Sequence, residues 1–508
     1  MSKFFARSAG AALAYTIATQ AAYADLTAQQ VWSDLQSYLA SAGYSVTGDE
    51  QQTGNGVNIQ NLALSMALPE DDGVFSVSMD SLAFTENGDG SISIVMPDSI
   101  PMAFSGSDAG EDAVSGVITY TQSGSDLTAT GTTEDINYVY GADRIALNLT
   151  SLVVEGETVP SDLARVAVQA DKIASNTRMQ IDDMRNYEQN LRADALTFDF
   201  AFADPESEDR ASLKGALQDV AFDSSGKIPM QMDPSDFNQM LADGFVIDGT
   251  LRYGAGSSDI EGTGDGTQFA MASASQGGQL SVQMDATRIA YDVEQQQTAL
   301  TMTGDELPFP LAVNAAVAAF NIAIPVAKSD AEQDFAAGLT LSDFTMSDML
   351  WAMFDPAAQL PRDPATLALD LTGKARVLFN FLDPAVAASL ETSGETPLEL
   401  NALTINKLLI SMVGAKLAGT GDFTFDNSDT ETFDGMPRPT GHIDLELVGS
   451  NALLDKLIAM GLVGDEEAMG ARMMMGMLAV PGSEPDTLNS KLEINAQGHV
   501  LANGQRIK

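Results

Sequence analysis

Methionine is concentrated in one short stretch of this sequence, "MGARMMMGMLAVPG", residues 469–482. Thioether sulfurs are soft ligands for Cu(I), so several converging methionines, often with a histidine nearby, would form a copper site. On a helix, Met469, Met473 and Met477 lie along one stripe, with Met474 beside it and Met475 turned away. Because methionine mainly fills irregular gaps, the pattern favours an apolar face packed in a core. An adaptable hydrophobic groove is the main alternative, and copper is a minor one.

A second methionine-containing helix is expected at residues 345–354, which place their apolar side chains on one side and stop before Pro356. It contributes two more methionines to the same choice between core and groove. The candidate residues for a hydrophobic ligand or a core face are Met349, Met353, Met469, Met473, Met474 and Met477. We assign no catalytic, cofactor-binding or metal-ligating residue.

Catalytic chemistry has little support in the sequence. The chain has no cysteine and only His442 and His499, so it cannot form a usual closed zinc site. A serine triad needs one of these histidines beside a nucleophile, yet there is no G-x-S-x-G elbow. The acidic segment "DNSDTETFDG" at residues 426–435 fails the spacing of a helix-loop-helix calcium site, although a nonstandard calcium loop stays open. We therefore expect a non-enzymatic protein without a cofactor, and a hydrolase is the least favoured alternative.

The start of the chain has the layout of a secretory signal peptide. Lys3 and Arg7 precede an apolar stretch, and Ala22-Tyr23-Ala24 precedes Asp25. We predict cleavage after Ala24 and export to the periplasm. The fold must then hold by packing alone, because no disulfide can form.

The formal net charge of the chain is -46. A chain of this charge repels phosphate backbones and anionic membrane surfaces, so nucleic acid is a poor candidate partner. One uncharged run, residues 307–327, is long enough to span a bilayer. It contains three prolines, however, and Phe320, Ile322 and Ile324 alternate as in a strand. We expect no stable membrane span.

The elements that must position these residues are mostly strands. A helix is expected first, because Thr27 and Gln30 form a capping-box pattern and Gly43 follows where a left-handed cap belongs. From about residue 56 the sequence alternates between apolar and polar residues, and "NGDG" at 87–90 is typical of a hairpin turn. The fold class is therefore mainly β with helices (α+β), a repeated antiparallel meander forming extended twisted sheets that a few amphipathic helices pack against.

A weak internal repeat divides the chain. "LALSMAL" (62–68) matches "LTFDFAF" (196–202), "SLAF" (81–84) matches "DVAF" (219–222), and the segment from Ser115 matches that from Asp248. A fainter third copy starts near residue 320. The predicted units are a signal peptide (1–24), an N-terminal helix and lead-in (25–55), a first β unit (56–192), a second (193–305), and a third with inserted helices and a C-terminal hairpin (306–508).

Motifs in the last third, among them "GAKLAGTGDFTFDN", "EEAMGARMMMGML" and "LEINAQGHVLANGQRIK", resemble an alphaproteobacterial family known as domain of unknown function 2125. The resemblance extends over nearly the whole chain after the signal peptide. It implies exported proteins without an established activity and supplies no catalytic residues. More loosely, the strand repeats are similar to envelope proteins whose β-groove handles lipid, which is a likeness of architecture only.

Two hypotheses about function follow. In the first, an exported non-enzymatic protein binds a lipid, another hydrophobic ligand or an envelope protein along a β-groove. In the second, a structural or interaction protein has a filled core, which would keep the methionines from an oxidant.

Overall fold

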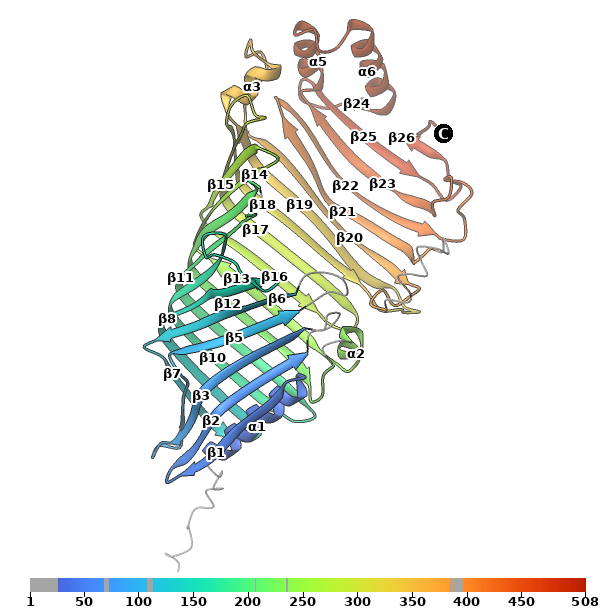
Figure 1. Cartoon of the computed structure of the whole chain (residues 1–508). Coiled ribbons are helices and arrows are strands. Elements are labelled where there is room, and N and C mark those ends of the chain that lie inside the picture. The colour runs from blue at the N-terminus through green and yellow to red at the C-terminus, as the bar shows by residue number, and fades with distance from the viewer. Residues whose placement is uncertain are drawn as a thin grey trace, which may run out of the picture.

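The computed structural model describes residues 26–508 except 68–72, 107–112, 206, 234–235, 384–385 and 387–395. The predicted signal peptide lies outside these residues. Antiparallel strands make up 64% of the structure and helices 11%. All the strands belong to one 27-stranded hydrogen-bonded sheet, shown in Figure 1. The mainly β, antiparallel architecture is thus confirmed, and the described strands form a single sheet.

The first half of the sheet contains the strands up to residue 304. They are β1 (Ser45–Thr53), β2 (Gly56–Ala67), β3 (Val74–Glu86), β4 (Ile92–Val95), β5 (Ser99–Gly106), β6 (Val114–Ser123), β7 (Asp126–Thr132), β8 (Asp135–Val154), β9 (Glu157–Thr158), β10 (Ala164–Ile181), β11 (Met184–Ala203), β12 (Arg210–Pro229), β13 (Val246–Tyr253), β14 (Ala255–Gly264), β15 (Thr267–Ser275), β16 (Gly278–Met284) and β17 (Arg288–Gly304).

The second half continues as a simple meander in which most strands pair with their neighbours in sequence. Its strands are β18 (Leu311–Pro325), β19 (Gln333–Met346), β20 (Ala365–Val377), β21 (Leu398–Met412), β22 (Ala415–Asp426), β23 (Arg438–Val448), β24 (Val480–Pro481), β25 (Thr487–Ile494), β26 (Val500–Ala502) and β27 (Gln505–Arg506). The uncharged run at 307–327 forms β18, as its alternation predicts, and no described helix is long and apolar enough to span a membrane.

The described residues contain five helices. They are α1 (Ala28–Ser41), α2 (Phe237–Ala242), α3 (Asp348–Phe354), α5 (Ser450–Ala459) and α6 (Asp465–Leu478). In Figure 1, α1 lies at the end of the sheet where β1–β3 are, whereas α3, α5 and α6 gather at the opposite end of the molecule. The predicted capping box of α1 is present, since Thr27 and Gln30 exchange hydrogen bonds, and Gly43 has the expected positive φ of 89°.

A crease crosses the sheet. Five long strands each contain one non-glycine residue with φ between 49° and 54°, namely Asn61, Lys172, Asp219, Gln297 and Asp343. A single residue in this left-handed conformation shifts the alternation of side chains and bends the strand. The ladders accordingly break at these positions, as between Gln60 and Leu62 opposite β3.

Other strands split in two along the same line. β12 pairs with β14 through residues 210–218 and with β13 through residues 221–227, so Asp219 lies at the split. β17 likewise pairs with β16 before Gln297 and with β15 after it. In the first part of the chain, β3 pairs with both β4 and β5, and β6 and β7 rejoin on β8. The sheet is therefore bent along this line, which divides each of these strands into two parts.

This split-and-rejoin arrangement occurs twice, but its order differs from the predicted repeat. By pairing, β6 takes the place of β15, whereas the sequence match aligned β6 with β13. Alternating strands with Gly and Asp turns resemble one another, so a sequence match can fall one strand out of step. The duplication and the unit boundaries at 192 and 305 stay predictions.

Candidate functional site

One face of the sheet carries unbroken rows of apolar side chains. Residues directly opposite each other in an antiparallel ladder point to the same side. Following the ladders from β16 to β21 gives the row Leu280, Val293, Phe320, Leu339, Leu369 and Leu408. The row continues through Gly419, Leu445 and Ser490 to β25. We call the side of the sheet that carries this row the apolar face.

Two further rows run parallel to the first one. The second is Val282, Tyr291, Ile322, Ala337, Leu371, Ile405, Gly421, Ile443 and Leu492. The third is Ala318, Leu341, Leu367, Ile410, Leu417, Leu447 and Leu488. None of the three rows contains a charged residue. The first one crosses eight strand-to-strand steps, which at about 4.8 Å each is about 38 Å.

Large side chains of the apolar face are exposed in the middle of the sheet. The exposed fraction is 48% for Phe320, 44% for Leu339, 41% for Leu280 and 40% for Tyr291. At the ends of the neighbouring strands, Phe269 is 52% exposed. Soluble proteins rarely leave contiguous apolar surface uncovered unless it binds something. This exposure separates the apolar face from an ordinary core.

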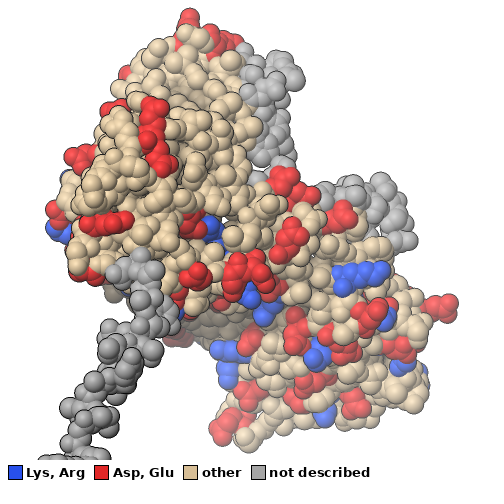
Figure 2. Space-filling model, turned by 90° about the horizontal axis from the view of Figure 1, so that it is seen from below, with Lys and Arg blue, Asp and Glu red and all other residues tan. Residues whose placement is uncertain are grey.

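The opposite side, the polar face, carries the charged residues of the same strands. Lys374 and Asp334, and Lys416 and Glu446, form ion pairs across adjacent strands on this side. Arg165 of β10 and Asp199 of β11 form another such pair earlier in the sheet. Figure 2 shows acidic side chains scattered over the surface, with fewer basic ones among them. Because strand residues alternate between faces, the acids of these strands solvate one side and leave the three apolar rows free of charge.

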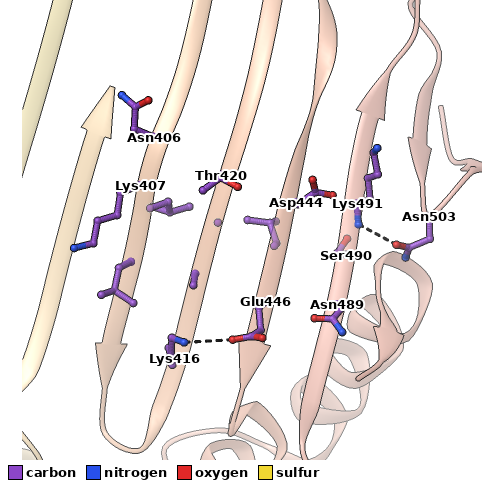
Figure 3. Close-up of a pocket in the computed structure, with 15 residues that line it drawn as sticks. Asn406, Lys407, Lys416, Thr420, Asp444, Glu446, Asn489, Ser490, Lys491 and Asn503 are labelled. Atoms are coloured by element: carbon purple, nitrogen blue, oxygen red, sulfur yellow. Dashed lines mark hydrogen bonds and ion pairs between the residues drawn. The ribbon is translucent and has the colours of Figure 1, made fainter. Parts of the chain in front are cut away.

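A hollow of about 700 Å³ lies on the polar face over β21, β22, β23 and β25. Lys407, Lys416 and Lys491 line it, together with Asp444 and Glu446. Figure 3 shows that Lys416 points to Glu446, at 3.3 Å, whereas Lys407 and Lys491 extend in different directions from strands that β22 and β23 separate. The three ammonium groups do not converge on one point. We therefore do not regard this hollow as the functional site.

At the β1 end, α1 covers the apolar face. Val31 and Trp32 of α1 are buried against Val57, Ile59 and Phe84 of β2 and β3. The cluster also includes residues of β4, β7 and β8 and, partly buried, Ile181 of β10, so the sheet curls around the helix.

A buried ion pair joins α1 to β11, on the other side of this curved part of the sheet. Arg185 of β11, with a side chain only 3% exposed, donates to both carboxylate oxygens of Asp34, at 2.6 and 3.0 Å. The guanidinium carbon of Arg185 also lies 5.3 Å from the ring centroid of Tyr38. Burial, assisted by the charge of Asp34, raises the pKa of Tyr138 beside the pair to about 12. Arg185 was not among the sequence candidates, because its pattern is that of any arginine in a strand.

The predicted methionine residues do not lie in a core. Met469, Met473, Met474 and Met477 are 54–66% exposed, and Met349 and Met353 are 49% and 64% exposed. In α6 the packed side holds Ala468, which is fully buried, and the half-buried Ala471, Met475 and Leu478. The core interpretation was therefore wrong. The helix has two apolar stripes, and the one with small alanines allows close packing on its neighbours.

The expected helix at 345–354 is shorter than predicted, because Met346 ends β19 and the helix begins at Asp348. Trp351, 8% exposed, anchors it, with its ring centroid 5.1 Å from that of Phe354 and 5.5 Å from the guanidinium carbon of Arg362. The indole therefore takes the buried position that the methionine pattern had suggested for Met349 and Met353.

The acidic loop weighed as a calcium site is held by an arginine. Arg438 donates to Asp429 at 2.8 Å and to Asp426 at 2.7 Å. These bonds occupy the oxygens that a cation would need, and no group of three metal-ligating side chains occurs within the described ranges. Of the two histidines, His442 lies 3.4 Å from Asp444, and His499 donates its backbone N–H to Asn495. Neither has a described hydrogen bond to a serine.

The fold and its exposed rows define a class of protein in broad terms: a long, creased antiparallel sheet with one uncovered apolar face. A sequence model of bacterial uncharacterised proteins, domain of unknown function 2125, matches residues 249–504, and the chain belongs to this family. The match is narrower than the resemblance suggested, since it covers the second half of the sheet, where the apolar face is open. No curated protein and no solved structure matches the chain.

Proposed function

We propose that this is an exported, periplasmic, non-enzymatic protein that binds the aliphatic chains of a lipid on its apolar face. The observation that carries the proposal is the set of uncharged rows, partly exposed, that cross the strands from β16 to β25. The signal-peptide pattern at the start of the sequence supports export.

The dimensions and chemistry of the rows suit acyl chains. Half of a bilayer's hydrocarbon core, the depth of one acyl chain, is about 15 Å, so a row of about 38 Å offers room for chains placed end to end. The rows consist mostly of aliphatic side chains, and only Tyr291 and Ser490 among their members carry a hydroxyl, so they would select apolar chains without selecting a head group. Each methylene withdrawn from water contributes about 0.8 kcal/mol.

The first test is native mass spectrometry of protein purified from the periplasm, followed by solvent extraction and lipid analysis. A lipid bound in near-stoichiometric amount is expected. An empty monomer would instead favour the second hypothesis, that this is a structural or interaction protein whose partner is another protein.

A matched pair of variants locates the ligand. Leu339→Glu places a charge in the first row, whereas Thr340→Glu places the same charge on the polar face of the same strand. We expect Leu339→Glu to lose bound lipid at least tenfold and Thr340→Glu to retain it, because burying an unpaired carboxylate beside an acyl chain is costly. Equal lipid content in the two variants, both folded by circular dichroism, would show that the apolar face is not the binding site.

A further inference from the structure

Exposed apolar side chains gather at one end of the sheet, on two helices, the segment between α5 and α6, and the end of a strand. They belong to α3, α5–α6 and the end of β21. These residues, which we call the methionine edge, are Met349, Met353, Phe354, Met412, Leu462, Met469, Met473, Met474 and Met477, each between 43% and 66% exposed. Figure 1 shows α3, α5 and α6 together at this end, where β19, β21 and β23 terminate.

Close backbone contacts join these elements into one edge. Gly414, in the turn between β21 and β22, approaches Pro361 after α3 so closely that an added Cβ would lie 3.0 Å from the proline Cγ. Gly449, which precedes α5, approaches the carbonyl oxygen of Gly414, and an added Cβ there would lie 2.3 Å from it. The loop that follows α3, the β21–β22 turn and the start of α5 are therefore adjacent.

The methionine edge is continuous with the apolar face. The third row reaches it through Ile410 of β21 and Leu447 of β23, and Met412, two residues beyond Ile410, belongs to both. Along β21, only the uncharged Ser411 separates Met412 from Ile410 in sequence. This continuity is the first argument that a hydrocarbon surface covers the methionine edge.

Charge is the second argument. Arg472 of α6 is paired with Asp455 at 2.5 Å, and Arg362 with Asp348. The first turn of α6 adds Asp465, Glu466 and Glu467, so the edge is acidic. Acidic groups repel anionic head groups and can pair with the ammonium group that a zwitterionic phospholipid presents outermost.

From these observations we propose that the methionine edge docks on the surface of a zwitterionic phospholipid bilayer, with its apolar side chains inserted among the acyl chains. Flexible thioether side chains adapt to an irregular hydrocarbon surface, and a helix that exposes an apolar stripe can lie in the plane of an interface. The docking would place the open end of the apolar face against the bilayer, and in that respect it rests on the proposed function.

The experiment is flotation of the purified protein with phosphatidylcholine vesicles. The test variant is Met473→Asp with Met477→Asp, and the control is Met436→Asp, an equally exposed methionine (64%) in the β22–β23 loop, which lies at the other ends of these strands. We expect the double variant to lose vesicle binding at least tenfold and the control to bind like the unchanged protein. Adding phosphatidylglycerol to the vesicles is expected to weaken binding.

Tryptophan fluorescence provides a second readout. The chain has two tryptophans, Trp351 in α3 at the methionine edge and Trp32 in α1 at the other end of the sheet. Brominated phosphatidylcholine vesicles are expected to quench Trp351 in the Trp32→Phe variant and not to quench Trp32 in the Trp351→Phe variant. Equal quenching of both would contradict docking through this edge.

Three further results would overturn the proposal: no flotation of the unchanged protein, undiminished flotation of the folded double variant, or a dimer in analytical ultracentrifugation that the double variant converts to monomer. These results are separable from the proposed function. If Leu339→Glu loses bound lipid but the unchanged protein does not float, the apolar face binds lipid and only the docking is wrong. If the unchanged protein floats but carries no lipid, the docking stands and the ligand site fails.

Discussion

The ion pair between Asp34 and Arg185 is expected to control how firmly α1 covers its end of the apolar face. The Arg185 side chain is 3% exposed and Asp34 is 20% exposed, so Asp34→Ala leaves a guanidinium buried without a counter-charge. Removal of one partner from a buried pair costs about 3–5 kcal/mol. The helix should nevertheless stay docked, because burial of side chains such as Val31 and Trp32 contributes about 1.5–3 kcal/mol each.

Hydrogen exchange of the α1 backbone amides measures this effect directly. At about 1.4 kcal/mol per factor of ten, Asp34→Ala should accelerate exchange of the protected α1 amides by about two to almost four orders of magnitude. The control is Asp135→Ala, because Asp135 forms an equally bidentate pair with Arg178, at 2.6 and 2.8 Å, that is exposed. Water screens that pair, so its loss should change exchange in its own hairpin far less.

The reasoning also predicts a rescue. If the cost arises from the unpaired guanidinium, then Arg185→Met introduced together with Asp34→Ala should restore most of the protection, since an apolar side chain of similar length needs no partner. Equal exchange in Asp34→Ala and Asp135→Ala, or no recovery in the double variant, would refute the assignment of α1 stability to this buried pair.

Three further predictions concern the cap of α5, the crease and the methionine edge. Asp486 accepts hydrogen bonds from the backbone N–H groups of Asn451 and Ala452 at the start of α5. Burial of the Asp486 carboxyl raises its pKa, but these hydrogen bonds and the charge of Arg472 have the larger effect and hold the pKa below its usual value. The stabilisation of α5 by Asp486 should therefore be complete above the unfolded pKa of about 3.9 and be lost as the pH falls through the lower folded pKa. At neutral pH, Asp486→Ala should lower the free energy of unfolding, measured in urea, by about 0.5–2 kcal/mol. At the crease, Gln297→Gly should be neutral or slightly stabilising and Gln297→Val should lower the melting temperature, because a β-branched residue tolerates a φ of 49° poorly; equal melting temperatures would contradict the strain argument. Hydrogen peroxide should oxidise Met469 and Met473 faster than Met475, as peptide mass spectrometry would show, and the reverse order would mean that α6 packs through its other side.

Local signals in the sequence predicted individual turns and caps well. The Thr27–Gln30 capping box, the positive φ at Gly43 and the hairpin through Asn87 and Gly90 are all present. Each depends on side-chain-to-backbone bonds or backbone freedom within a few residues, so the sequence contains all the information needed. The start of α5 shows the limit, because its cap comes from Asp486, 35 residues away from Asn451.

The crease could not be predicted for a related reason. Lysine, glutamine, asparagine and aspartate occupy its left-handed positions, and lysine and glutamine rarely mark such a conformation. The positions become recognisable only when the ladders are known, since each lies where a ladder skips a pair. Alternation within one strand therefore predicts two faces but does not predict where the faces bend.

Alternation also does not predict what covers an apolar face, and this explains the error over the methionines. Met469, Met473 and Met477 have the spacing of a core stripe, and Phe320, Leu339 and Leu369 have that of a core row, yet five of these six side chains are more than 40% exposed. A buried stripe and a binding surface obey the same periodicity, because both must exclude water when they are occupied. The difference lies in how much of the apolar face is covered. This long sheet has one apolar face along its length, and α1 covers it at only one end. Mutual repulsion at a net charge of -46 opposes the stacking of apolar faces of two copies, which leaves the open rows accessible to a small apolar ligand.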